Sequence, residues 1–242
     1  MAGLKKWMSP ALFDGTTAED EYHLPRQLPR EIYEARIRIH RSEYITERDF
    51  VSIKAMGMNT VRIPVPYFVF GDREPFIGRI KELDKAFQWA ERYGLKILID
   101  LHTVPMGQNG FDNGGICGVC KWDQYPEEVE FVLSVLERLA MRYGNREGLW
   151  GIEVLNEPIT DREWEVEDIP NRFPATDPEM AKGSGPITME FLRDFYCKAY
   201  DRIRRSMPEE KYINVVLDTH QYLMMAESDG CQQELSSYLA YV

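Results

Sequence analysis

The sequence predicts an α/β protein built on a parallel sheet, and three observations support this prediction. Helix and strand patterns alternate four times along the 242 residues, with a short turn from each helix into the next strand. One of these strands, residues 149–158, reads Leu-Trp-Gly-Ile-Glu-Val-Leu-Asn-Glu-Pro, an apolar run that suits a strand buried on both faces. The strand-to-helix loops are long, notably residues 107–125 and 159–187, and long loops at one edge of a sheet usually build a site.

Composition predicts one large domain over residues 1–242, because 44% hydrophobic residues suffice for a substantial core. The net charge of −11 argues against a nucleic acid or an anionic membrane surface as partner, so neutral ligands fit better. The N-terminus has no apolar run of signal-peptide length, and no run approaches a membrane span. The expected location is therefore cytoplasmic.

The first predicted helix and strand are recognised by the residues at their ends. The segment before residue 28 has no sustained period, which predicts irregular structure. Thr46 is then a helix N-cap with acidic residues in the following turn, and Gly57 ends that helix. Residues 59–65 predict a strand that carries Arg62 and ends at Pro64.

The next two units repeat this order. Residues 80–93 form an amphipathic pattern with Gly94 behind it, and the strand over residues 96–102 ends in Asp100-Leu-His102. Pro126 opens a helix over residues 126–143, which leads into the strand over residues 149–158. Because side chains alternate along a strand, we expect Glu153 and Glu157 on one face of it and Asn156 on the other.

The last unit begins at Thr188, which caps a helix with apolar residues at core spacing. A strand is predicted over residues 214–222, and it contains Asp218-Thr-His220-Gln-Tyr222.

The two long loops carry aromatic residues and a Cys-x-x-Cys pair. The aromatic side chains can stack on sugar rings or simply pack the loops, and the sequence leaves both interpretations open. Cys117 and Cys120 are interpreted as loop thiols, because a structural zinc site needs four ligands. The aromatic residues are Phe111, Trp122, Tyr125, Trp164 and Phe173.

Six polar residues come from the tips of different strands, as in barrel enzymes. One interpretation is structural: Arg62 pairs with a buried carboxylate such as Glu153, and each His is an ordinary buried polar group. Taken together, the six favour glycoside hydrolysis with Glu157 as the acid, because the sequence has no Gly-rich phosphate loop and no Ser nucleophile elbow. No cofactor is expected. The six residues are Arg62, His102, Asn156, Glu157, His220 and Tyr222.

Four motifs in this order resemble glycoside hydrolase family 5, closest to its exo-β-1,3-glucanase-like branch and bacterial relatives. They are Trp-Gly-Ile-Glu-Val-Leu-Asn-Glu-Pro, Asn-Thr-Val-Arg-Ile-Pro, Asp-Leu-His followed by Gln-Asn-Gly-Phe-Asp-Asn, and Asp-Thr-His-Gln-Tyr. The resemblance implies a (β/α)8 TIM barrel and retaining hydrolysis of a β-glucoside or β-glucan. It further implies Glu157 as acid/base, Asn156 on the sugar 2-hydroxyl, Arg62 orienting the nucleophile, and a sugar site lined by His102, His220 and Tyr222.

The sequence also departs from that family, and the departures predict an incomplete barrel. Lys5 stands where relatives usually have a sugar-binding Glu on the first strand, one βα unit is missing before residue 214, and the last two strands with the nucleophile Glu are absent. Retention needs a second carboxylate at about 5 Å, and both Asp100 and Asp218 are expected to lie too deep. Open strand edges predict a complementing chain or self-association.

Two other functions stay open. The chain could be a non-catalytic or vestigial β-glucan-binding fragment, because function belongs to the site and not to the fold. It could also be a metal-dependent hydrolase that holds an ion between His102, His220 and a carboxylate.

Overall fold

The computed structural model describes residues 8–166 and 168–207, together with residues 210, 212, 215, 216 and 220. The chain forms two compact units, Met1–Tyr212 and Ile213–Val242, and the fold below is that of the first unit. The single catalytic domain over residues 1–242 stays a prediction. Within the described residues, no helix has the length and apolar character needed to cross a membrane.

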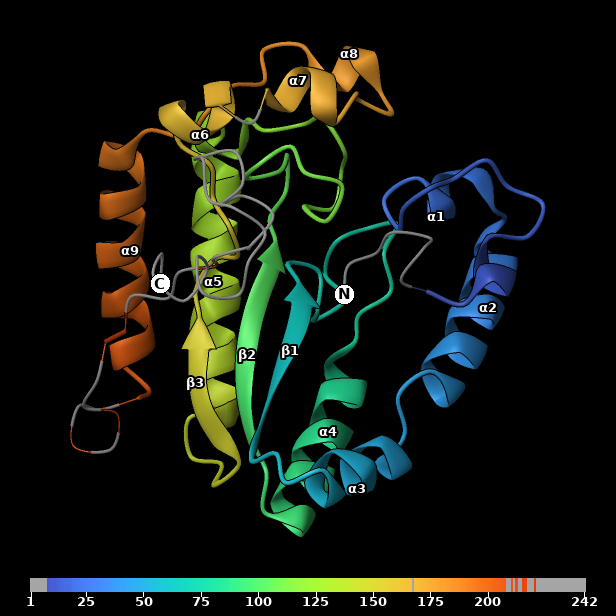
Figure 1. Cartoon of the computed structure of the whole chain (residues 1–242), viewed down its shortest axis with the longest axis vertical. Helices are drawn as coiled ribbons and strands as arrows, with labels where there is room; N and C mark the ends of the chain where they lie inside the picture. Colours follow the sequence, from blue (N-terminus) through green and yellow to red (C-terminus); the bar gives the residue numbers. More distant parts are fainter. Residues whose placement is uncertain are drawn as a thin grey trace, which may run out of the picture. The chain divides into compact units, whose positions relative to one another are not determined.

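Among the described residues of the first unit, three parallel strands form a sheet in the order β1, β2, β3 (Figure 1). They are β1 (Thr60–Pro66), β2 (Lys96–Thr103) and β3 (Leu149–Glu153). The central strand β2 is the most buried, with Ile97, Ile99 and Leu101 all inaccessible. This confirms the prediction of an α/β protein with a parallel sheet.

Three long helices accompany the sheet, and each follows the predicted pattern. They are α4 (Ile80–Tyr93), α5 (Pro126–Tyr143) and α9 (Met189–Arg204). Helix α9 packs against α5 (Figure 1). Helix α5 also contacts α4, through the stacked rings of Tyr143 and Phe87, whose centroids lie 4.3 Å apart.

The helix ends also confirm the sequence signals. Thr46 precedes α3 (Glu47–Ala55), where its backbone N–H and its hydroxyl both donate to Asp49 Oδ2, at 2.7 and 2.9 Å. Thr188 Oγ1 accepts from the Phe191 N–H at 3.2 Å at the start of α9. Gly94 ends α4 in the left-handed conformation, with φ of 63°.

The N-terminal region is more ordered than predicted. It holds η2 (Pro10–Phe13), α1 (Leu24–Gln27) and α2 (Arg30–Glu43), which was not predicted. The first two are too short to show a helical period, and α2 buries only a narrow stripe of a highly charged segment. These elements share a small core of their own, formed by Met8, Leu12, Phe13, Ala18, Leu24, Tyr33 and Ile37.

Two strand ends differ from the prediction. Strand β1 continues through Pro64 to Pro66, because β1 lies at an edge of the described sheet and a proline nitrogen needs no partner on the open side. Strand β3 ends at Glu153, so the expected alternation does not extend to Asn156 and Glu157. There the chain turns instead, and Glu157 has a positive φ of 42°.

The two long loops contain short helical elements. The first has η3 (Trp122–Gln124), and the second has α6 (Asp161–Val166), α7 (Ile169–Arg172) and α8 (Pro178–Ala181). The predicted strand over residues 214–222 lies mostly outside the described residues, and its described residues Val215, Val216 and His220 are not in a strand.

Candidate active site

Arg62, the third residue of β1, contacts side chains from all parts of the site. From β1, its Nε donates to Glu153 Oε2 and its Nη2 to Glu153 Oε1, both at 2.7 Å. Its Nη1 lies 3.0 Å from Asp100 Oδ2 on β2, and Nη2 also donates to Asn156 Oδ1 at 2.7 Å. The structural interpretation, that Arg62 pairs with Glu153, is therefore correct, and the same guanidinium also reaches a predicted site residue.

The neighbouring carboxylates stabilise the positive charge of Arg62. Burial opposes the charge, but Glu153 and Asp100, with a smaller effect from Glu157, outweigh it and raise the pKa of Arg62. Asp100 is fully buried, and Arg62 is the cation paired with it. The site thus has a fixed positive charge close to Glu157.

His102 is held by the same carboxylate. Its Nδ1 lies 2.7 Å from Asp100 Oδ2, and its ring is buried at the end of β2. Because a carboxylate accepts hydrogen bonds, this contact makes Nδ1 the donor. Asp100 therefore links Arg62 to His102.

Glu157 lies in the loop after β3, where it is half-buried. Its Oε2 accepts from Asn113 Nδ2 at 3.1 Å and from Asn156 Nδ2 at 3.4 Å. Asn156 is almost completely buried, and its amide is oriented by its two neighbours, with the oxygen toward Arg62 and the nitrogen toward Glu157. Four of the six predicted residues, Arg62, His102, Asn156 and Glu157, thus form one connected network.

The other two predicted residues belong to the unit Ile213–Val242. His220 is exposed and belongs to the unit Ile213–Val242, and Tyr222 lies outside the described residues. Their role in a sugar site stays a prediction.

Three amide side chains that were not predicted as site residues also contact the site. Gln108 Nε2 donates to the carbonyls of His102 and Asn156, at 2.8 and 3.0 Å. Asn109 Nδ2 donates to the Glu157 carbonyl at 3.0 Å, and Asn113 donates to its carboxylate. Their signal was the run Gln-Asn-Gly-Phe-Asp-Asn directly after β2, since polar amides in a glycine-containing loop beside a strand end are suited to hold backbone groups.

Three of the loop aromatic residues, Phe111, Trp122 and Phe173, pack against other aromatic rings. Trp122 is fully buried, edge-on to Phe191 and Phe195 of α9 with centroids 5.3 and 4.9 Å apart. The rings of Phe111 and Phe173 lie 5.1 Å apart and join the two long loops. The packing interpretation holds for Trp122, which has no ring face open to a sugar.

The cysteine pair is present as free thiols. Cys117 is half-buried and Cys120 is buried, and burial raises the pKa of the Cys120 thiol. In the part of the chain that the structure describes, no group of three His, Cys, Asp or Glu side chains is placed to hold a metal ion.

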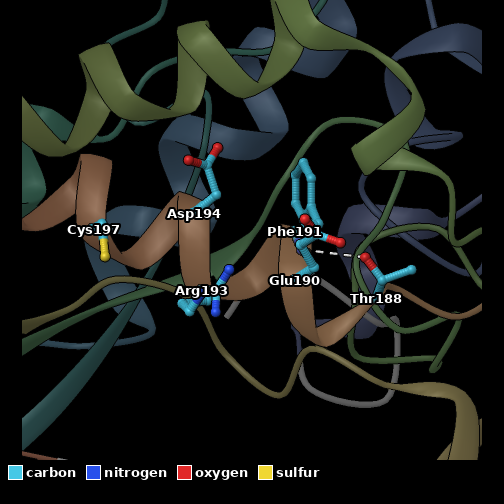
Figure 2. A pocket seen from close by; sticks show the side chains of 6 residues that line it. All are labelled: Thr188, Glu190, Phe191, Arg193, Asp194 and Cys197. Carbon is cyan, nitrogen blue, oxygen red and sulfur yellow. Dashed lines mark hydrogen bonds between the residues drawn. The ribbon is translucent and has the colours of Figure 1, made fainter.

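A shallow pocket lies over the first turns of α9, and none of the predicted site residues lines it. Figure 2 shows its side chains, which project from α9 and from the cap residue before it. It is lined by Thr188, Glu190, Phe191, Arg193, Asp194 and Cys197.

Fold and site together define an α/β protein with a charged and amide-rich cluster at the carboxyl ends of parallel strands. Comparison with known proteins gives the family. The family description Cellulase (glycosyl hydrolase family 5) matches residues 35–239. The chain belongs to glycosyl hydrolase family 5.

Two curated relatives agree with the exo-β-1,3-glucanase-like branch. The chain is 35% identical over 243 residues to "Probable glucan 1,3-beta-glucosidase A" of Emericella nidulans, covering 90% of this chain and 54% of that protein. It is 33% identical over 229 residues to "Glucan 1,3-beta-glucosidase" of Candida oleophila, covering 88% and 48%. The chain therefore spans about half the length of the curated relatives it matches.

A solved structure shows the same fold. The rutinosidase from Aspergillus niger superposes with a TM-score of 0.62 at 19% identity, over 85% of this chain and 58% of that one. At this identity, the similarity concerns the fold alone.

Proposed function

We propose that this chain forms the N-terminal and central part of a (β/α)8 barrel of a retaining glycoside hydrolase that acts on β-glucan or β-glucosides. The observation that carries the proposal is the Glu157 carboxylate, which lies just beyond the end of β3 between the amides of Asn113 and Asn156. The names of the curated relatives support a β-1,3-glucan as substrate.

Glu157 is the general acid/base in this proposal. It protonates the leaving glycosidic oxygen and later takes a proton from the attacking water. Asn156, with its amide fixed between Arg62 and Glu157, binds the sugar 2-hydroxyl. His102, oriented by Asp100, lines the same sugar ring.

Arg62 supports this site by fixing Asn156 and by supplying positive charge. Its contacts with Glu153, Asp100 and Asn156 occupy both of its terminal nitrogens and Nε. Its orientation of a nucleophile, implied by the family resemblance, stays part of the proposal.

The nucleophile is a second carboxylate at about 5 Å from the acid. Glu153 and Asp100 are both bound to Arg62, and this lowers their nucleophilicity. We therefore assign the nucleophile to a further segment, supplied in cis by a longer chain or in trans by a complementing chain.

Azide chemistry tests this assignment. The 242-residue chain is incubated with 2,4-dinitrophenyl β-glucoside and sodium azide, and the glucosyl azide is identified by NMR against a protein-free control. Direct displacement by azide inverts the sugar and gives the α-azide, whereas attack on a covalent glucosyl-enzyme gives the β-azide. The proposal predicts the α-azide. The β-azide would place the nucleophile within the chain, and the absence of protein-dependent product would contradict a hydrolase site.

The second candidate is a β-glucan-binding fragment without turnover. It is favoured by the observation that both carboxylates bound to Arg62 are engaged, while the Asn156 amide and the His102 ring remain placed for sugar contacts. Calorimetric binding of a β-1,3-gluco-oligosaccharide, with no azide product and no glucose release, would support it.

A further inference from the structure

Glu157 has an unusual backbone conformation. Its φ of 42° lies in the left-handed region, which residues other than glycine rarely adopt. Such a conformation is strained and persists only where the surrounding structure holds it. The turn that carries the carboxylate therefore needs a support.

The support comes from the loop after β2. Gln108 Nε2 donates to the Asn156 carbonyl at 3.0 Å, and Asn109 Nδ2 donates to the Glu157 carbonyl at 3.0 Å. The Ile159 N–H in turn donates to the Gln108 carbonyl at 3.2 Å. Gln108 and Asn109 are both fully buried, so these hydrogen bonds lie in a region of low dielectric. Three hydrogen bonds, at residues 156, 157 and 159, thus hold the backbone on both sides of the Glu157 side chain.

Gln108 connects the two strand ends. The same Nε2 that holds the Asn156 carbonyl also donates to the His102 carbonyl, at 2.8 Å. Its Oε1 is buried and has no hydrogen-bond donor among the described residues. A buried acceptor without a donor lowers the stability of the fold. The value of this amide therefore lies in the two carbonyls that its N–H groups hold.

Asn109 is itself held in place by its loop. Its Oδ1 accepts from the Phe111 N–H at 3.0 Å. A Cβ added at Gly114 would lie 2.3 Å from this oxygen, so the close approach requires glycine at that position. Gly114 therefore offers a way to displace Asn109 without touching Glu157.

We propose that Gln108 and Asn109 are positioning residues for acid/base catalysis, which hold the Glu157 turn through its backbone carbonyls and tie it to His102. This inference rests on the proposed role of Glu157. The two side chains contact only peptide groups of the site residues, so they act through Glu157 and not on the substrate.

The test compares two leaving groups in the full 242-residue chain with azide as external nucleophile. Phenyl β-glucoside needs a proton on its leaving oxygen, whereas 2,4-dinitrophenyl β-glucoside does not. We expect Gln108→Leu and Gly114→Ala to slow phenyl glucoside cleavage about 100-fold and dinitrophenyl glucoside cleavage no more than about threefold, because a misplacement of about 1 Å disables the acid alone. A purely structural role would lower both rates equally, and this result would overturn the proposal.

Two matched controls accompany these variants. Gln124→Leu removes an exposed amide that donates to the Gly183 carbonyl at 2.9 Å, a similar link between two loops. Gly185→Ala adds a methyl group where no atom lies within 4 Å. Both controls are expected to keep the wild-type ratio of the two rates, and a changed ratio in either would overturn the assignment to residues 108 and 109.

A second measurement does not depend on turnover. The ¹³C carboxyl signal of Glu157, assigned by its loss in Glu157→Gln, is titrated in the wild-type chain and in each variant. We expect its titration to change in Gln108→Leu and Gly114→Ala and to stay unchanged in the two controls. An unchanged signal in all four would refute positioning, while a changed signal in a chain that cleaves neither glucoside would refute the proposed function alone.

Discussion

The Arg62 guanidinium donates two parallel hydrogen bonds to the Glu153 carboxylate, from Nε to Oε2 and from Nη2 to Oε1, each 2.7 Å long. The planar fork of an arginine matches a carboxylate in this way, and a lysine ammonium cannot. The remaining nitrogen, Nη1, contacts the buried Asp100, which in turn holds His102. One side chain of β1 thus organises residues on β2, on β3 and after β3.

Arg62→Lys is expected to destabilise the chain by about 1–3 kcal/mol, because one ammonium group cannot replace the guanidinium contacts with Glu153, Asp100 and Asn156 together. Urea denaturation measures the loss. Arg146→Lys is the matched control, since Arg146 makes the same paired contact with Glu91 at the surface, at 2.8 and 2.6 Å. It is expected to cost less than about 1 kcal/mol. Equal losses in the two variants would contradict the special role of Arg62.

Asn113→Ala is expected to slow phenyl β-glucoside cleavage in azide about tenfold, because the Glu157 carboxylate loses one charge-assisted hydrogen bond of about 1.4 kcal/mol. Asn113→Asp places a like charge beside Glu157 and is expected to move the alkaline limb of the pH–rate profile upward, since it favours the protonated acid. A profile for Asn113→Asp that coincides with that of the wild type would show that Asn113 does not act on Glu157.

Glu21→Gln tests the buried ion pair between Glu21 and Arg79. Burial raises the pKa of Glu21, but the charges of Arg79 and Arg41 outweigh it, and the net shift is downward. Removal of the carboxylate leaves these guanidinium groups without their counter-charge, and we expect a loss of about 3–5 kcal/mol at neutral pH. The exposed Glu34, which pairs with Arg30 within α2, provides the control Glu34→Gln, expected to cost less than about 1 kcal/mol.

The sign of the pH dependence follows from the lowered pKa of Glu21. A carboxyl with a depressed folded-state pKa stabilises the fold above its unfolded-state pKa of about 4.3, and this stabilisation is lost as the pH falls through the folded-state value. The difference in unfolding free energy between wild type and Glu21→Gln is therefore expected to shrink progressively in acid. A difference that is constant from neutral to acid pH would contradict the assignment.

Trp122→Ala separates packing from sugar stacking. The fully buried indole lies between Phe191 and Phe195, and its removal is expected to cost about 3–5 kcal/mol by opening a cavity between the first long loop and α9. Trp150→Ala, at a side chain that is 57% exposed, is expected to change stability by less than about 0.5 kcal/mol. Weaker oligosaccharide binding by Trp122→Phe with unchanged stability would instead indicate a sugar platform.

Local signals predicted much of the fold. The bounds of α4 and α5 follow from hydrophobic period, Pro126 and Gly94, and the caps Thr46 and Thr188 are recognisable from neighbouring residues alone. Helix α2 escaped prediction because it buries only a narrow stripe of a highly charged segment, against a small core formed with residues 8–24. The early end of β3 was missed because a turn with positive φ at a glutamate has no local sequence signal.

The sequence predicted four of the residues that form the site, but only some of the hydrogen bonds that connect them. Strand-tip positions identified Arg62, His102, Asn156 and Glu157, and the pairing of Arg62 with Glu153 was foreseen as one interpretation. The amides after β2 were not identified, because their partners are distant in the sequence. Gln108 and Asn109 contact backbone carbonyls 48 residues further on, and Asn113 contacts the Glu157 carboxylate 44 residues further on. Such contacts are fixed by the register of the sheet and are not visible in the spacing of the motif.

The assignment of Glu157 as the catalytic acid is tested most directly by comparing the wild-type chain with Glu157→Gln. Both proteins are assayed on the two glucosides in the presence of azide. If Glu157 is the acid, the variant loses phenyl β-glucoside cleavage by about 100-fold or more and cleaves 2,4-dinitrophenyl β-glucoside at close to the wild-type rate. Equal rates of the two proteins on phenyl β-glucoside would contradict the assignment of Glu157 as the catalytic acid.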